Sequence, residues 1–84
     1  MTEHEYRKTM ISVELLTLRQ FSNEELAAFN LAIQLYGRVQ PENLSFEKAV
    51  RFKLIQDDGS LWDAETLKAA CAIEVNDRHD RGER

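Results

Sequence analysis

The sequence predicts an all-α fold, a compact small bundle of about four short helices, from two observations. Apolar residues recur every three to four residues through most of the chain, as they do on the buried face of a helix. Helix start signals occur at Ser22 and Asp63, and a stop signal occurs at Gly37. A chain of 84 residues, 43% hydrophobic and 31% charged, has the composition of one folded domain. We expect a helical domain over residues 1–76 and a flexible charged tail over 77–84.

The first helix is expected from about Glu5 to Gln20. The apolar residues of this segment fall on two sides of a helical projection, Tyr6, Met10, Val13 and Phe21 on one and Ile11, Leu15 and Leu18 on the other. The alternative is a strand, because Ile11, Val13 and Leu15 alternate with polar residues.

The second helix is expected between Ser22 and Gly37. Ser22 and the glutamate three residues later match a capping box, and glycine commonly ends a helix. The apolar residues on its main side, which we expect in the core, are Leu26, Phe29, Ile33 and Tyr36. Leu31 and Leu35 point to another side. A helix that is apolar over so much of its circumference is either central in the fold or covered by a partner.

The third apolar segment allows two interpretations. Phe46, Val50 and Leu54 recur every four residues, which favours a helix over about Leu44 to Ile55. The same segment also alternates as a strand, and Asp58-Gly59 is a typical hairpin turn. That alternative would make the fold α+β with a hairpin around Asp58-Gly59.

The fourth helix is expected to begin after Asp63, which suits the N-cap position. Its apolar face consists of Ala64, Leu67, Cys71 and Val75. Ile73 lies outside this face. Trp62, just before the helix, suits either a packing role over the core or a binding hot spot, where tryptophan is enriched.

Residue types that carry chemistry are sparse in this chain. The three glycines are isolated, so the sequence lacks the glycine-rich loops that hold phosphates. Cys71 is the single cysteine, and the two histidines, His4 and His79, lie near the chain ends. We therefore expect no catalytic, cofactor or metal site, and no enzymatic activity.

The net charge and the cysteine content bear on where the protein acts. A formal net charge of -4 argues against nonspecific binding to nucleic acid or anionic membrane. One cysteine allows no disulfide within the chain, and no apolar run reaches membrane length. The sequence thus favours a cytoplasmic protein.

The leading functional hypothesis is a small non-catalytic protein that binds another protein, as a regulator, adaptor or inhibitor of the bacterial or phage accessory type. It rests on apolar side chains left off the main face of each helix, since exposed apolar patches mark interfaces. The expected interaction residues are Leu31, Leu35, Phe52, Trp62 and Ile73. The partner is expected to be another protein, a second copy in a homodimer, or both.

The alternative hypothesis is a DNA-associated transcriptional or nucleoid regulator. The segment from Arg38 to Gln56 has four basic and two acidic residues, a net charge of +2. The helices around it are arranged in sequence like a helix-turn-helix. The basic residues that would contact nucleic acid are Arg38, Lys48, Arg51 and Lys53.

Overall fold

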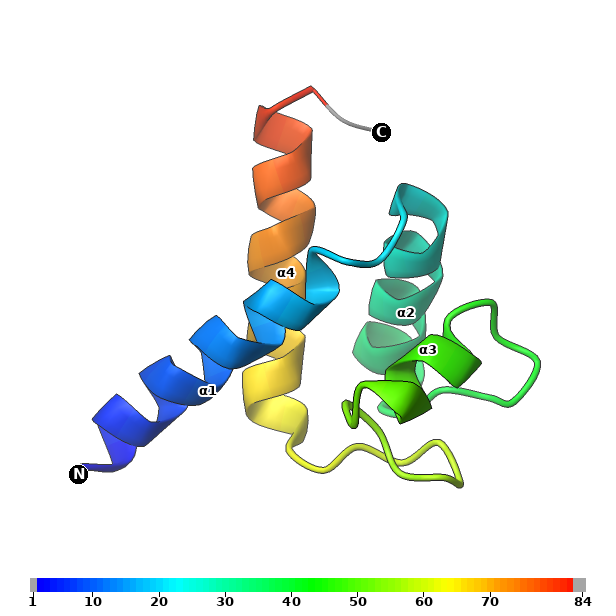
Figure 1. The fold of residues 1–84 in the computed structure, drawn as a ribbon, viewed down its shortest axis with the longest axis horizontal. Helices are drawn as coiled ribbons and strands as arrows, with labels where there is room; N and C mark the ends of the chain where they lie inside the picture. The colour runs from blue at the N-terminus through cyan, green and yellow to red at the C-terminus, as the bar shows by residue number, and fades with distance from the viewer. Residues whose placement is uncertain (1, 83–84) are drawn as a thin grey trace.

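Four helices make up the fold across residues 2–82, which are the residues that this computed structural model describes (Figure 1). They are α1 (Glu3–Leu18), α2 (Asn23–Tyr36), α3 (Phe46–Arg51) and α4 (Ala64–Asp80). Across the described residues the chain forms isolated β-bridges but no strand. The all-α prediction is confirmed. Within the same residues, no helix combines the length and apolar character needed to cross a membrane.

Helices α2 and α4 lie side by side and run antiparallel, and α1 crosses α4 (Figure 1). At one end of the α2–α4 pair, Gln34 Nε2 donates to the Lys68 carbonyl at 3.2 Å. At the other end, Arg78 Nη1 donates to Asn23 Oδ1 at 2.8 Å. The first half of α1 projects from the body of the molecule, and every residue from Thr2 to Thr9 is exposed.

The helix ends follow the signals in the sequence. Glu25 N donates to Ser22 Oγ at 3.1 Å and Ser22 N donates to Glu25 Oε1 at 2.8 Å, so the capping box is formed. Gly37 ends α2 in the left-handed conformation, with φ of 67°. Asp63 caps α4 by accepting from Thr66 N at 3.3 Å. Helix α1 begins two residues earlier than predicted, because Thr2 caps its start, and it ends at Leu18, two residues before the predicted end.

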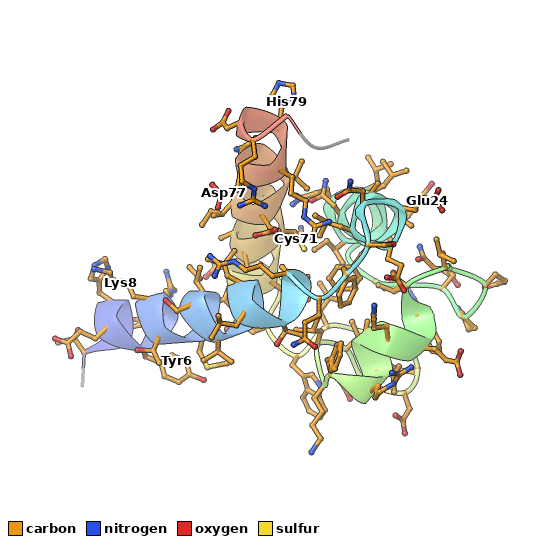
Figure 2. All side chains as sticks on the ribbon, turned by 45° about the horizontal axis from the view of Figure 1, so that its top comes forward. Tyr6, Lys8, Glu24, Cys71, Asp77 and His79 are labelled. Carbon is orange, nitrogen blue, oxygen red and sulfur yellow. The ribbon has the colours of Figure 1, made fainter. Side chains whose placement is uncertain are left out.

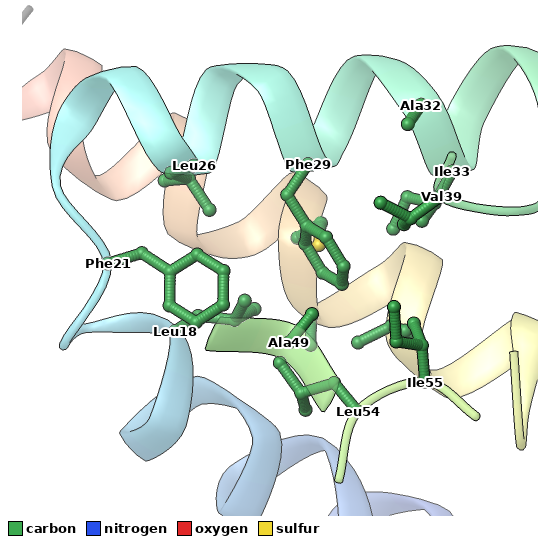
Figure 3. Close-up of a cluster of buried hydrophobic side chains, with 13 residues drawn as sticks. Leu18, Phe21, Leu26, Phe29, Ala32, Ile33, Val39, Ala49, Leu54 and Ile55 are labelled. Carbon is green, nitrogen blue, oxygen red and sulfur yellow. The ribbon is translucent and has the colours of Figure 1, made fainter. Parts of the chain in front are cut away.

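The hydrophobic core lies between α2, α3 and α4, and Phe29 is its largest fully buried side chain (Figure 3). Phe29 and Phe21 have ring centroids 5.5 Å apart. Phe29 and Ile33 are fully buried, as predicted. The prediction for Tyr36 is wrong, because this side chain is 70% exposed. Tyr36 is the last residue of α2 and lies beyond Ile33, the last α2 residue in the core cluster.

Helix α3 is shorter than the predicted helix over Leu44 to Ile55, because the chain turns at Lys53. Lys53 has φ of 61°, a left-handed conformation that side-chain-bearing residues rarely adopt. Lys53 N donates to the Val50 carbonyl at 3.0 Å, and Leu54 N donates to the Ala49 carbonyl at 2.9 Å. These two bonds form a Schellman motif, which ends the helix.

A tight turn follows at Asp58-Gly59, where the alternative interpretation placed a hairpin. Gln56 N donates to the Ser60 carbonyl at 2.8 Å across the turn. An isolated antiparallel bridge joins their neighbours, Ile55 and Leu61. Gly59 has φ of 90°, and a Cβ atom there would overlap the Val39 carbonyl oxygen. The turn is therefore present, but its arms do not extend into strands within the described residues, so the α+β alternative is not adopted.

Helix α4 continues through Asp80, past the point where the sequence predicted the tail of residues 77–84 to begin. The cause is Arg78, which is buried and bonded to the end of α1 and to the connection between α1 and α2. Its Nη2 donates to the carbonyls of Leu18 and Phe21, at 3.1 and 2.8 Å. The prediction of a tail from residue 77 is corrected to this extent. Residues 83–84 lie outside the described part of the chain.

Glu74 is fully buried and supplies the negative charge that Arg78 pairs with. Arg78 Nε donates to Glu74 Oε2 at 2.9 Å. Arg19 and Arg81, both about half exposed, place nitrogens 3.7 and 3.6 Å from the same carboxylate. A buried carboxylate is tolerated only when it is paired, so this cluster fixes the end of α1 against α4.

Candidate protein-binding surfaces

A groove of about 550 Å³ runs between the outer sides of α2 and α4, and we call it the α2–α4 groove. It is lined by Asn23, Leu26, Ala27, Asn30, Leu31, Val75, Arg78 and His79. The antiparallel packing of the two helices creates it, since α2 contributes its first three turns and α4 its last two. Its volume falls in the range of ligand pockets, roughly 300 to 1,000 Å³.

Leu31 and Leu35 belong to an exposed apolar stripe along α2. Leu31 is 58% exposed and lines the groove, and Leu35 is 63% exposed and lies one turn further on. Ala27, one turn before Leu31, is also exposed and lines the groove. Residues four apart share one side of a helix, so Ala27, Leu31 and Leu35 make a continuous stripe about 12 Å long.

Polar groups border the groove and hold its walls in place. Asn30 Oδ1 accepts from Gln34 Nε2 at 3.3 Å, and Gln34 also donates to the Lys68 carbonyl of α4. His79 lies at the far end of α4 (Figure 2). An apolar floor with a polar border is the composition of a protein interface.

A second groove, of about 860 Å³, lies beside Trp62, and we call it the Trp62 groove. It is lined by Met10, Val50, Lys53, Ile55, Gln56, Asp57, Asp58 and Trp62. Trp62 is 67% exposed, which does not fit the packing role over the core, one of the two roles that the sequence allowed. The Asp58-Gly59 turn carries the chain back from α3 toward α4 and so places Trp62 opposite Met10 of α1.

The projecting half of α1 extends this second apolar surface. Tyr6 and Val13 are about half exposed and lie four residues before and three residues after Met10. These spacings put all three on one side of α1. Tyr6 and Lys8 leave the helix on opposite sides (Figure 2), so the apolar stripe is separate from the basic side of the helix.

The remaining predicted interaction residues lie elsewhere. Ile73 is 40% exposed, but two helical positions separate it from Val75, so it faces away from the α2–α4 groove. Phe52 is partly buried and packs on the core, with its ring centroid 6.3 Å from that of Phe21. Phe52 is therefore part of the packing around the core. The other predicted interaction residues lie on three surfaces: Leu31 and Leu35 at the α2–α4 groove, Trp62 at the Trp62 groove, and Ile73 on another side of α4.

The four basic residues of the DNA hypothesis have different surroundings. Lys48 Nζ donates to Glu25 Oε1 and to the Gln20 carbonyl, each at 2.9 Å. Arg38 Nη2 donates to the Asp58 carbonyl at 2.7 Å. Arg51 and Lys53 are exposed at the end of α3, and Lys53 lines the Trp62 groove. Two of the four side chains thus hold the fold together.

The titratable groups inside the molecule are shielded from solvent. Burial, reinforced by the nearby Glu14 carboxylate, raises the pKa of the Cys71 thiol to about 12, so the thiolate does not form near neutral pH. Burial also raises the pKa of Glu14, whose Oε1 has no hydrogen-bond partner among residues 2–82. Glu14 and Cys71 are buried where α1 packs on α4, and this burial raises both pKa values. A structural role is therefore enough to explain them.

Signals for some of these features are present in the sequence and others are not. The spacing of Ala27, Leu31 and Leu35 could have identified the stripe on α2. The Trp62 groove depends on the path of the chain after Lys53, which no local pattern indicates.

Across residues 2–82 no group of three or more metal-ligating side chains forms a candidate metal site. Comparisons of this chain with protein-family models, with curated proteins and with solved structures gave no match.

Proposed function

We propose that this protein is a non-catalytic binding protein, a regulator, adaptor or inhibitor, that holds another protein in the α2–α4 groove. The observation that carries the proposal is the exposure of Leu31 and Leu35 in one stripe beside a groove with an apolar floor. Single exposed leucines are ordinary on protein surfaces, but a continuous stripe next to a groove is typical of an interface.

The shape of the groove favours a helix as the bound element. The stripe runs along α2, and Leu26 and Val75 form a floor between α2 and α4. An amphipathic helix laid along this groove would bury its apolar face on Ala27, Leu31 and Leu35, as in other helix-in-groove complexes. The partner's helix would then pack as a third helix beside the antiparallel pair of α2 and α4.

The groove is preorganised for binding. The capping box and Gly37 define both ends of α2, and Gln34 links its last turns to α4. At the opposite end, Arg78 ties α4 to Asn23 of α2. Rigid walls lower the entropy cost of binding, so a modest apolar contact suffices for measurable affinity.

The test uses the chain as bait in a lysate of the source organism, in three forms: wild type, Leu31→Glu/Leu35→Glu, and Leu16→Glu. Leu16 is an equally exposed leucine on α1, outside both grooves, and serves as the matched control. We expect a partner retained by the wild type and by Leu16→Glu but lost from the double variant. Full burial of an exposed leucine contributes about 1.5 to 3 kcal/mol, and Leu31 and Leu35 have 58% and 63% of their surface left to bury, so the double change should weaken binding by at least roughly 20-fold.

The result that would overturn the proposal is a partner retained equally by all three forms, or one lost equally from both variants. Circular dichroism of each form shows whether the helices are intact. Glutamate at either exposed position of α2 should leave the helical content unchanged, because glutamate is a good helix former.

A further inference from the structure

The Trp62 groove shares no lining residue with the α2–α4 groove and has a different chemistry. Its apolar part combines Trp62 with Met10 of α1, and Val50 and Ile55 complete the floor. Tryptophan is one of the residues enriched at the hot spots of protein interfaces. The stripe on the projecting half of α1 adds Tyr6 to the same side as Met10.

Acidic side chains outnumber basic ones around the Trp62 groove. Asp57 and Asp58 line the groove and Asp63 follows Trp62, and all three are exposed. Lys53 is the one basic residue in the lining, and Arg38 Nη2 lies beside the groove as a donor to the Asp58 carbonyl at 2.7 Å, so the three carboxylates outnumber the two cations. Hydrogen bonds from the Ser60 side chain and backbone lower the pKa of Asp58, so this carboxylate stays ionised at any pH near neutral. The groove thus presents an apolar centre within a net negative border.

We propose that the Trp62 groove binds a basic, amphipathic segment of a partner protein. A large apolar side chain of that segment would contact Trp62 and Met10, and its lysines or arginines would face Asp57 and Asp58. The inference rests on the proposed role in protein binding, but it assigns a second surface to a partner of stated charge. With both grooves occupied, the chain would bridge two protein segments, which is the action of an adaptor.

Charge also decides against a second copy of this chain as the occupant. Each chain carries a formal net charge of -4, and the segment from Asp57 to Val75 alone has five acidic residues and one basic residue. A dimer formed through this surface would bring two such segments together. A basic segment instead gains from the same charges, and complementary charge raises the rate and the specificity of association.

The single tryptophan of the chain makes the test direct, because its fluorescence reports only on this groove. The probe is a short synthetic amphipathic helix of leucine and lysine, and its counterpart has glutamate in place of every lysine. We expect the lysine peptide to shift the Trp62 emission to shorter wavelength, since it covers a side chain that is largely exposed in the free chain. The glutamate peptide should bind at least roughly tenfold more weakly, and added salt should weaken binding of the lysine peptide.

Three variants locate the binding site. Asp57→Asn removes one carboxylate and should weaken binding of the lysine peptide by roughly two- to fivefold, whereas Lys53→Gly removes the opposing cation and should strengthen it by a similar factor. Leu31→Glu/Leu35→Glu changes only the other groove, so it should leave the affinity for the peptide unchanged.

Four results would overturn the assignment. They are no emission shift with the lysine peptide, equal affinity for both peptides, loss of peptide binding in the Leu31→Glu/Leu35→Glu variant, and a shift that grows with protein concentration when no peptide is present. The last of these would indicate a second copy in the groove. The proposed function is tested separately, because a partner captured through Leu31 and Leu35 would stand whatever the peptide does at Trp62.

Discussion

Replacing Arg78 with methionine should lower the free energy of unfolding more than the removal of any solvent-exposed charged side chain. Methionine has similar length and keeps apolar contacts, so the change removes mainly the charge and its hydrogen bonds. Arg78 donates to the Glu74 carboxylate, to Asn23 Oδ1 and to the carbonyls of Leu18 and Phe21, over 2.8 to 3.1 Å.

The magnitude follows from the burial of the pair. The side chains of Arg78 and Glu74 are 9% and 0% exposed, so water does not replace the lost partner. Removing one member of a buried ion pair costs about 3 to 5 kcal/mol. Arg19 and Arg81 remain 3.7 and 3.6 Å from Glu74, so we expect the lower end, about 3 kcal/mol. For a domain of this size that lowers the Tm by roughly 12 to 24 °C.

Chemical denaturation followed by circular dichroism measures the effect. Arg7→Met is the matched control, because Arg7 also pairs with two carboxylates, Glu3 and Glu65, but is half exposed. An exposed pair contributes about 0 to 1 kcal/mol. The double variant Glu74→Leu/Arg78→Met should recover part of the loss, because no buried charge is left unpaired. A cost below about 1 kcal/mol for Arg78→Met would refute the argument that this cluster holds α1 to α4.

Three further predictions follow from the backbone and from Glu14. Lys53→Gly should stabilise the chain by about 1 kcal/mol in a thermal melt, because glycine adopts a positive φ without steric cost; a loss of stability would contradict the Schellman ending of α3. Gly59→Ala should cost more than Gly37→Ala in a denaturant titration, since a Cβ at Gly59 overlaps the Val39 carbonyl whereas nothing lies within 4 Å of one at Gly37; equal costs would contradict the turn. Burial raises the pKa of Glu14, so its contribution to stability is full below its unfolded pKa and is lost as pH rises through its folded pKa. Glu14→Gln should therefore raise stability at neutral pH and flatten its decline with pH above the ordinary glutamate pKa of 4.5, and an unchanged pH profile of the melting temperature would contradict this.

Local signals were enough to predict the helices and much of the core. Ser22 and Asp63 cap α2 and α4 as predicted, and Gly37 ends α2, because capping depends on residues within one turn of the helix end. Phe29 and Ile33 are buried as the helical periodicity indicated. Periodicity also separated Leu31 and Leu35 from the core side, and both are exposed.

The remaining features depend on contacts between distant residues. The sequence predicts a tail at Arg78 because residues 76–84 lack apolar side chains, yet its partners Leu18 and Phe21 lie about 60 positions earlier. The end of α3 depends on a left-handed lysine, whereas the ordinary signal would be glycine. The meeting of Trp62 and Met10 in one groove depends on how the chain returns from α3 to α4, so it could not be predicted from local patterns.

Sedimentation velocity of the chain with its captured partner tests the central claim, that Leu31 and Leu35 form a protein-binding surface. The samples are the wild type, Leu31→Glu/Leu35→Glu and the control Leu16→Glu, each alone and mixed with the partner. We predict that the wild type and Leu16→Glu sediment as a complex and that the double variant, with unchanged helical content, sediments separately from the partner. A double variant that keeps its helices and still sediments in the complex would contradict the claim.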